Sequence, residues 1–152
     1  MAILYEYAIQ NQRADSTPDV DHSITGAKIL PMVAHENMAF NDICYINSDG
    51  ECAIADADAE ATAGVLFVCA DESISADATG NFAFIPSGFI IRDDTWNWST
   101  KGAWVYLSTT GTTGNTWTTT APSGTDDATV HLGKVLTANV IAVGHLLIIE
   151  HQ

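Results

Sequence analysis

The stretch DICYINSDGECAIA, residues 42–55, decides the fold class, because two short apolar segments flank an Asp49-Gly50 pair. Asp-Gly between such segments is a strong β-hairpin signal and is typical of a type I′ turn. A link of small residues follows, and then the apolar run AGVLFVC at residues 63–69. A short, continuous apolar run is typical of a strand buried on both faces. The pattern predicts strand, turn, strand, link and strand.

A second part of the chain repeats this order. The segment AWVYLSTTG, residues 103–111, is followed by WTTTAP at 117–122 and by HLGKVL at 131–136. Strand signals recur about every 8 to 12 residues, with turn residues between them. The sequence therefore predicts an all-β fold, a β-sandwich or barrel-like domain, with two related hairpin units. An alternation of period two does not distinguish two packed sheets from a closed barrel.

The first 26 residues differ from the rest of the chain. Tyr5, Tyr7 and Ile9 alternate with Glu, Ala and Gln as in a short strand, and a polar run follows them. We predict a short N-terminal arm or extended segment over residues 1–26 and a single β domain over residues 27–152. The alternative for the first 26 residues is an edge strand and loop of the same domain.

The charge balance limits the choice of partners. The chain has 19 acidic and five basic residues, for a formal net charge of −14. Such a surface repels phosphate groups, so we expect no nucleic acid and no membrane as a partner. No secretory signal sequence and no apolar run of about 20 residues is recognisable. Acidic solubility alone explains the charge as well as a particle exterior does.

The three cysteines are expected to be buried thiols. A two-residue Asp49-Gly50 turn would pair Asn47 with Cys52, which places Cys52 and Cys44 on opposite faces of the hairpin. A disulfide between these two residues is therefore not predicted. Together with Cys69, they indicate a protein made in a reducing cytoplasm.

The sequence carries no motif that we interpret as catalytic. Ser87 and Ser123 each lie in a Pro-Ser-Gly turn instead of a Gly-x-Ser-x-Gly motif. The apolar and acidic surroundings of the cysteines raise a thiol pKa, which disfavours a cysteine nucleophile. We therefore expect a protein that is not an enzyme, although any two of the 19 acids could form a glycosidase pair.

Metal or cofactor binding is not predicted either. The five histidines do not have the spacing of zinc ligands. A zinc site would therefore have to be assembled from several subunits around a three-fold axis. One group of nearby acids could offer oxygens to Ca²⁺, but it lacks the EF-hand pattern. Alternating acids of this kind commonly form a solvated face. These acids are Asp49, Glu51, Asp56, Asp58 and Glu60.

Aromatic residues are the candidate contact groups. Trp117 lies in a threonine-rich hairpin and is expected to be exposed. We predict that such aromatics pack between subunits or against a partner surface, where Trp is often a hot spot. The alternative is a stacking platform for a sugar. The candidate partner-binding residues are Tyr5, Tyr7, Ile9, Trp96, Trp98 and Trp117.

The second unit resembles β-rich structural proteins of tailed bacteriophages. The resemblance lies in GAWVYLSTTG (102–111), TTTAPSG (118–124), HLGKVLTA (131–138) and the Val140-Ile141 pair that follows. Head decoration (cement) and head-fibre proteins carry this pattern of strand and turn residues, and tail-fibre segments carry it too. The first unit is similar to a degenerate copy, so the resemblance covers residues 27–149. It implies an oligomer, commonly a trimer, and no catalytic residues.

From this resemblance we expect a non-enzymatic virion structural protein. It would bind the major capsid protein on the outer capsid surface as a homo-oligomer and stabilise the phage head. The alternative is a head- or tail-fibre adhesin module that binds a host-surface glycan. A fibre adhesin usually has a long shaft with repeats, and the absence of one from this sequence favours the decoration protein.

Overall fold

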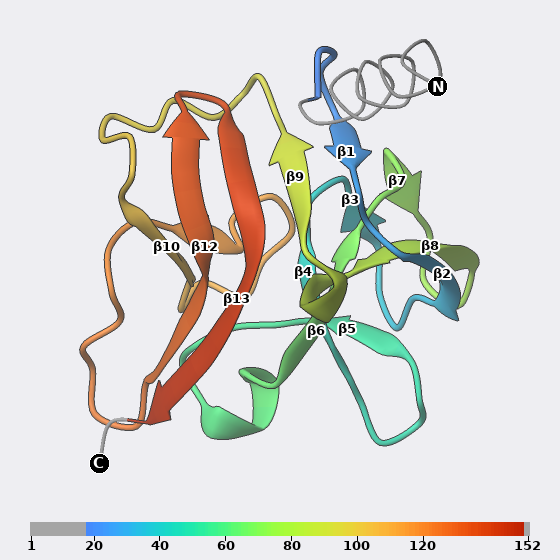
Figure 1. Ribbon diagram of the computed structural model, residues 1–152. Helices are drawn as coiled ribbons and strands as arrows, with labels where there is room; N and C mark the ends of the chain where they lie inside the picture. Colours follow the sequence, from blue (N-terminus) through green and yellow to red (C-terminus); the bar gives the residue numbers. More distant parts are fainter. Residues whose placement is uncertain (1–17, 151–152) are drawn as a thin grey trace, which may run out of the picture.

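The computed structural model describes residues 18–150, and for residues 145–150 it describes only the backbone (Figure 1). The fold is all-β and sandwich-like, as the sequence predicts, with antiparallel sheets that pack together. Within the described residues, no helix is long and apolar enough to cross a membrane.

Two large sheets and one small sheet make up the structure. The six-stranded sheet has the spatial order β1 (Ser23–Thr25), β9 (Phe89–Arg92), β13 (Val140–Glu150), β12 (Ala128–Thr137), β10 (Trp104–Leu107) and β11 (Trp117–Thr118). The five-stranded sheet has the order β2 (Ile29–Val33), β8 (Thr79–Phe84), β6 (Val65–Cys69), β4 (Ile43–Ile46) and β5 (Cys52–Ile54). The small sheet pairs β3 (Met38–Ala39) with β7 (Ser73–Ile74), and two 3₁₀ turns are η1 (Glu60–Thr62) and η2 (Ile85–Ser87).

The two large sheets have the same topology. Let the strands β2, β4, β5, β6 and β8 be numbered one to five along the chain. Their order across the sheet is then one, five, four, two, three. The strands β9, β10, β11, β12 and β13 lie in that same order, and β1 is an addition at the β9 edge. The two related units predicted from the sequence are β4-β5-β6 and β10-β11-β12. Each is part of a larger five-stranded repeat.

The strand registers match as well as the order does. The β4–β6 ladder has an irregularity between Cys44 and Tyr45, and the β10–β12 ladder has one between Val105 and Tyr106. Each ladder skips one residue of the partner strand at that point, so Tyr45 and Tyr106 are equivalent. When the comparison is continued through the β6–β8 and β12–β13 ladders, Ala83 of the five-stranded sheet is equivalent to Ala142 of the six-stranded sheet.

The main core lies between the two large sheets. Fully buried side chains such as Ile43 and Val68 from the five-stranded sheet meet Leu107, Leu132 and Ile141 from the six-stranded sheet. A second, smaller core lies on the other face of the five-stranded sheet, where β3 and β7 contribute Met38 and Ile74. Its remaining buried members are Ala34, Cys44, Cys52, Ile54, Phe67, Cys69 and Phe82.

The predicted type I′ turn at Asp49-Gly50 is wrong. Asn47 pairs with Glu51, so the loop holds three residues, with Gly50 at φ +81°. The Asn47 side chain fixes this loop, because its Oδ1 accepts hydrogen bonds from the backbone N–H groups of Asp49 and Glu51, both at 3.0 Å. A G1-type loop therefore replaces the two-residue turn.

The extra loop residue shifts the register by one, which reverses the side-chain direction along the second strand. Cys52 pairs with Ile46 and lies on the same face as Cys44, contrary to the prediction. The prediction of buried thiols is confirmed, and all three cysteines are free. Burial raises the pKa of Cys52 and of Cys69 to about 12 and that of Cys44 well above its ordinary value.

Candidate functional site

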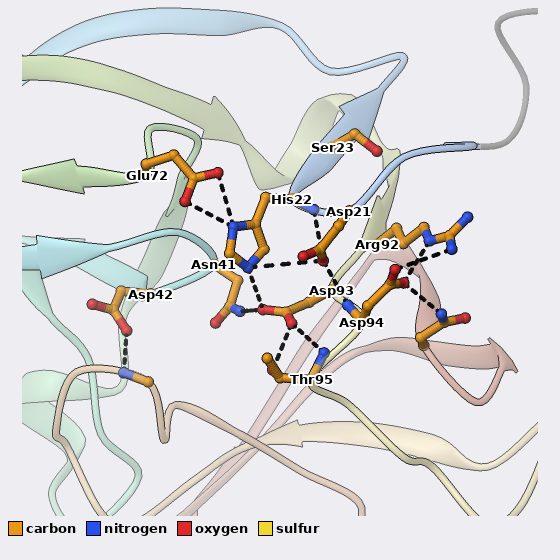
Figure 2. Close-up of polar contacts among 12 residues, drawn as sticks. Asp21, His22, Ser23, Asn41, Asp42, Glu72, Arg92, Asp93, Asp94 and Thr95 are labelled. Carbon is orange, nitrogen blue, oxygen red and sulfur yellow. Dashed lines mark hydrogen bonds and ion pairs between the residues drawn. The ribbon is translucent and has the colours of Figure 1, made fainter.

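A cluster of polar side chains forms where β1 and β9 meet. The two strands are antiparallel, with Ser23 opposite Arg92. The residues just before β1 and just after β9 therefore emerge at the same end of the ladder. This places Asp21 and His22 beside Asp93, and one ligand atom from each of the three lies within 4.8 Å of the others (Figure 2).

His22 is held in one orientation by contacts on both ring nitrogens. Its Nδ1 lies 2.8 Å from both carboxylate oxygens of Glu72. Its Nε2 lies 3.6 Å from Asp93 Oδ2 and 3.8 Å from Asp21 Oδ1. The ring stacks on Phe40 with 4.8 Å between the ring centroids. The backbone at His22 is left-handed, with φ +50°.

Asp93 is the buried member of the cluster, with only 3% of its surface exposed. Its Oδ1 accepts hydrogen bonds from the backbone N–H and the hydroxyl of Thr95. Its Oδ2, the oxygen that faces His22, also accepts a hydrogen bond from Asn41 Nδ2. Asn41 is itself 5% exposed, and its Oδ1 has no hydrogen-bond partner among the described residues.

Acidic side chains surround the His22 ring. Burial lowers the pKa of His22, but the hydrogen bond to Glu72 and the nearby Asp21 and Asp93 carboxylates outweigh that effect and raise it. Asp21 Oδ1 is fixed by backbone N–H groups, at 2.9 Å from His22 and 2.7 Å from Asp94. A concentration of acids around one imidazole is an arrangement that attracts a cation.

Sequence reasoning missed this cluster. The histidine and the aspartates of the cluster lie in two short segments of the sequence. One segment is inside the predicted N-terminal arm and the other follows an apolar strand. The dipeptides Asp21-His22 and Asp93-Asp94 were the available signal. Only the pairing of the three-residue strand β1 with β9 brings them together.

A second surface feature lies on the six-stranded sheet, on the face turned away from the main core. A shallow groove of about 430 Å³ crosses β10, β12 and β13. Lys134 Nζ lies 4.4 Å from the centroid of the Trp104 ring, and His131 contacts both Trp104 and Tyr106 edge-on. The groove is lined by Trp104, Gly133, Lys134, Leu136, Ala142, Val143 and Gly144.

The predicted contact residues are placed differently. Trp117 is buried in the main core, with its Nε1 donating a 2.7 Å hydrogen bond to the Asn41 carbonyl, so the expectation that it is exposed is wrong. The alternation of side-chain direction along β11 turns Trp117 toward the core, although its neighbours in the sequence are polar. Trp96 and Trp98 are half-buried, and Trp96 contacts both Trp98 and Trp117. Tyr5, Tyr7 and Ile9 lie outside the described residues.

The acids considered for calcium do not form a shared site in the part of the chain that the structure describes. Asp56 Oδ1 instead accepts hydrogen bonds from the Asp58 backbone N–H and the Thr62 hydroxyl. Glu51 pairs with His35 on the first hairpin. Asp56 and Glu51 therefore stabilise local structure.

Comparison of the chain with protein-family models, with curated proteins and with solved structures gives no match. The resemblance to phage head proteins consequently remains a prediction from the sequence pattern.

Proposed function

We propose that the protein is a virion structural protein of the decoration (cement) type. It binds the major capsid protein on the outer capsid surface as a homo-oligomer, a trimer, and stabilises the phage head without catalysis. The six-stranded sheet supplies the contact surface through its outward face. Linked contacts in an oligomer give avidity beyond that of any single contact.

The observation that carries this proposal is the composition of the outward face. The chain has a net charge of −14, yet the outward residues around the groove, Trp104, Tyr106, His131, Lys134 and Leu136, include no acid. Lys134 is one of only five basic residues in the chain. Aromatic and apolar side chains with few acids are the composition of a protein interface core.

The match between the two repeats supports the same conclusion. The core-facing positions of the five-stranded sheet correspond to outward positions of the six-stranded sheet. The pairs are Ile43 with Trp104, Tyr45 with Tyr106, Val65 with His131, Val68 with Lys134, and Ala83 with Ala142. In the first repeat, this face is covered by the second repeat. In the second repeat, the equivalent face carries the open groove, which a partner can cover.

The test uses two matched exposed residues. Leu136 lines the groove and is 44% exposed, whereas Ile29 lies on the edge strand β2 outside the groove and is 45% exposed. We expect the wild-type protein and the Ile29→Asp variant to co-sediment saturably with capsids stripped of decoration protein. The Leu136→Asp variant should lose most of this binding. Light scattering measures the mass of each variant and should give a trimer.

Two results would contradict the proposal. Failure of the folded wild-type protein to bind capsids would remove the decoration function. Equal binding by both variants would remove the groove as the contact surface. Binding to a glycan array that depends on Trp104 and Tyr106 would favour the adhesin function instead.

A further inference from the structure

Three carboxylates surround the His22 ring. Because Nδ1 faces both oxygens of Glu72 at 2.8 Å, this nitrogen carries a ring proton. Nε2 faces the carboxylates of Asp21 and Asp93. Two carboxylates around one ring nitrogen favour a positive charge at that place, which is either a second ring proton, in line with the raised pKa of His22, or a metal ion bound in its stead.

The spacing of the three groups suits a metal ion. In a tetrahedral zinc site with bonds of about 2.0–2.1 Å, neighbouring ligand atoms lie about 3.4 Å apart. The Nε2 atom lies 3.6 Å from Asp93 Oδ2 and 3.8 Å from Asp21 Oδ1, so small side-chain movements reach that geometry. The Glu72 carboxylate on Nδ1 is the usual outer partner of a metal-bound histidine, because it fixes the tautomer and makes Nε2 more basic.

Asn41 provides a separate indication. Its side chain points at Asp93 in Figure 2, is nearly fully buried, and has an Oδ1 with no hydrogen-bond partner among the described residues. A buried amide with one unsatisfied atom is unfavourable. A half-turn of the carboxamide exchanges the two atoms, so that Oδ1 lies next to Asp93 Oδ2 and Nδ2 takes the position without a partner. The two oxygens can face each other there only with a cation between them, and Oδ1 would then be its fourth ligand.

We propose that Asp21, His22 and Asp93 bind one divalent transition-metal ion of the zinc class. Asn41 Oδ1 or a water molecule completes the coordination. Zinc fits the donor set better than calcium or magnesium, because imidazole nitrogen is a typical zinc ligand and the latter two ions prefer sites made only of oxygen.

The position of this site gives the metal a structural consequence. Asp21 and His22 immediately precede β1, Asp93 follows β9, and Glu72 precedes β7. The ion would therefore fasten the segment before β1 to the end of β9 and, through Glu72, to the small sheet of β3 and β7. This role is independent of the proposed function, since it concerns how the chain is held and not what the groove binds.

The experiment is isothermal titration of the full-length protein with ZnCl₂, with CaCl₂ and MgCl₂ as comparison ions. We expect one zinc ion per chain with a Kd of about 10 μM or lower and no comparable heat from the other two ions. Replacement of zinc by Co²⁺ should give the visible absorption of a tetrahedral nitrogen–oxygen site. Circular dichroism confirms that each variant is folded.

The variants keep the backbone geometry. His22→Asn removes the imidazole, and Asn tolerates a positive φ better than most residues. It should weaken zinc binding at least about a hundredfold, beyond the loss that outer partners of metal ligands cause. Glu72→Gln should weaken it about tenfold. The control is His35→Asn, because His35 also pairs with a carboxylate, that of Glu51, but belongs to no group of three ligands in the described chain.

Three results would overturn the proposal. The first is no saturable zinc binding at neutral pH, which would leave the cluster as an ordinary protonated histidine with its acids. The second is weak binding at several sites that His22→Asn does not change, which would reflect only the overall negative charge. The third is equal loss of binding in His22→Asn and His35→Asn.

Discussion

The two five-stranded repeats share their topology and registers but differ in what lies on their faces. In the first repeat, one face of the sheet packs on the main core and the other on a second core of cysteines, methionine and phenylalanines. In the second repeat, one face packs on the main core and the other carries the open groove.

The register match shows how the repeats are stacked. In the first repeat, one face of the sheet packs against β3 and β7. The equivalent face of the second repeat packs against the first repeat. Cys44 and Phe82 in the second core match Val105 and Ile141 in the main core. The repeats therefore follow each other in the same orientation, with β3 and β7 closing one end. At the other end, the outward face of the six-stranded sheet carries the groove and is not covered by another sheet of the described chain.

The largest effect should come from testing whether the second core is as well packed as the main core. Phe82 is fully buried there and has an edge contact with Phe67. We expect Phe82→Ala to lower the free energy of unfolding by about 4 kcal/mol, because the cavity cannot collapse fully. Urea denaturation measures this. The control is Leu136→Ala on the open face, with a loss below about 0.5 kcal/mol. Similar small losses in both variants would show that β3 and β7 cover no true core.

The next test concerns a position where the repeats cannot be interchanged. Gly133 matches Phe67, but a Cβ at Gly133 would lie 1.8 Å from the Ala142 carbonyl oxygen. The obstacle is backbone, so the β12–β13 pair would have to separate. We expect Gly133→Ala to destabilise the fold by about 3 kcal/mol. Gly64→Ala is the control, since nothing lies within 4 Å of its Cβ position and its φ is not positive. Equal stability of the two variants would contradict the close approach of β12 and β13.

Much of the fold could be predicted from the sequence. The two related units and the buried strand at residues 65–69 follow from local patterns, and the structure has them. Details that depend on one side chain could not be predicted. The Asn47 amide lengthens the first hairpin loop by one residue, which reverses the direction of Cys52.

The candidate site was harder to predict than the fold. The three-residue strand β1 has no distinctive periodicity, so its pairing with β9 leaves no trace in the sequence. Trp117 was misplaced for a related reason. Its threonine neighbours indicate a polar strand, while the strand it joins turns that one side chain toward the core. Pairing between strands that are far apart in the sequence determines the position of β1 and the direction of Trp117. Local composition carries no information about such pairing.

A smaller effect should separate the matched tyrosines. Tyr45 packs against the main core, whereas Tyr106 lies on the open face. The Tyr106 ring contacts the His131 ring, with 4.8 Å between the ring centroids. We expect Tyr45→Ala to lower the free energy of unfolding by about 2 kcal/mol and Tyr106→Ala by about 1 kcal/mol. Urea denaturation of the two variants under the same conditions gives the difference. A larger loss from Tyr106→Ala would mean that the outward face stabilises the fold, and would weaken its assignment as a contact surface.

The smallest effect concerns an ion pair that only the first repeat has. His35 Nδ1 lies 2.9 Å from Glu51 Oε2, beside the edge strand β5, where Ala34 forms a parallel bridge with Cys52. The equivalent of Glu51 in the second repeat is Thr116, which carries no charge. The hydrogen bond with Glu51 raises the pKa of His35 above its ordinary 6.5 and, in turn, lowers the pKa of Glu51 below its ordinary 4.5.

The pH dependence of this pair follows from the two directions. Both groups are charged between pH 4.5 and 6.5, so the pair contributes fully to stability in that window. The contribution is lost as the pH rises through the raised pKa of folded His35, and lost again as it falls through the lowered pKa of folded Glu51. An NMR titration of the His35 ring should give a midpoint above 6.5 in the wild type, which Glu51→Gln moves back toward 6.5. The same midpoint in both proteins would show that no such pair forms, and the edges of the two repeats would then differ only in their backbone.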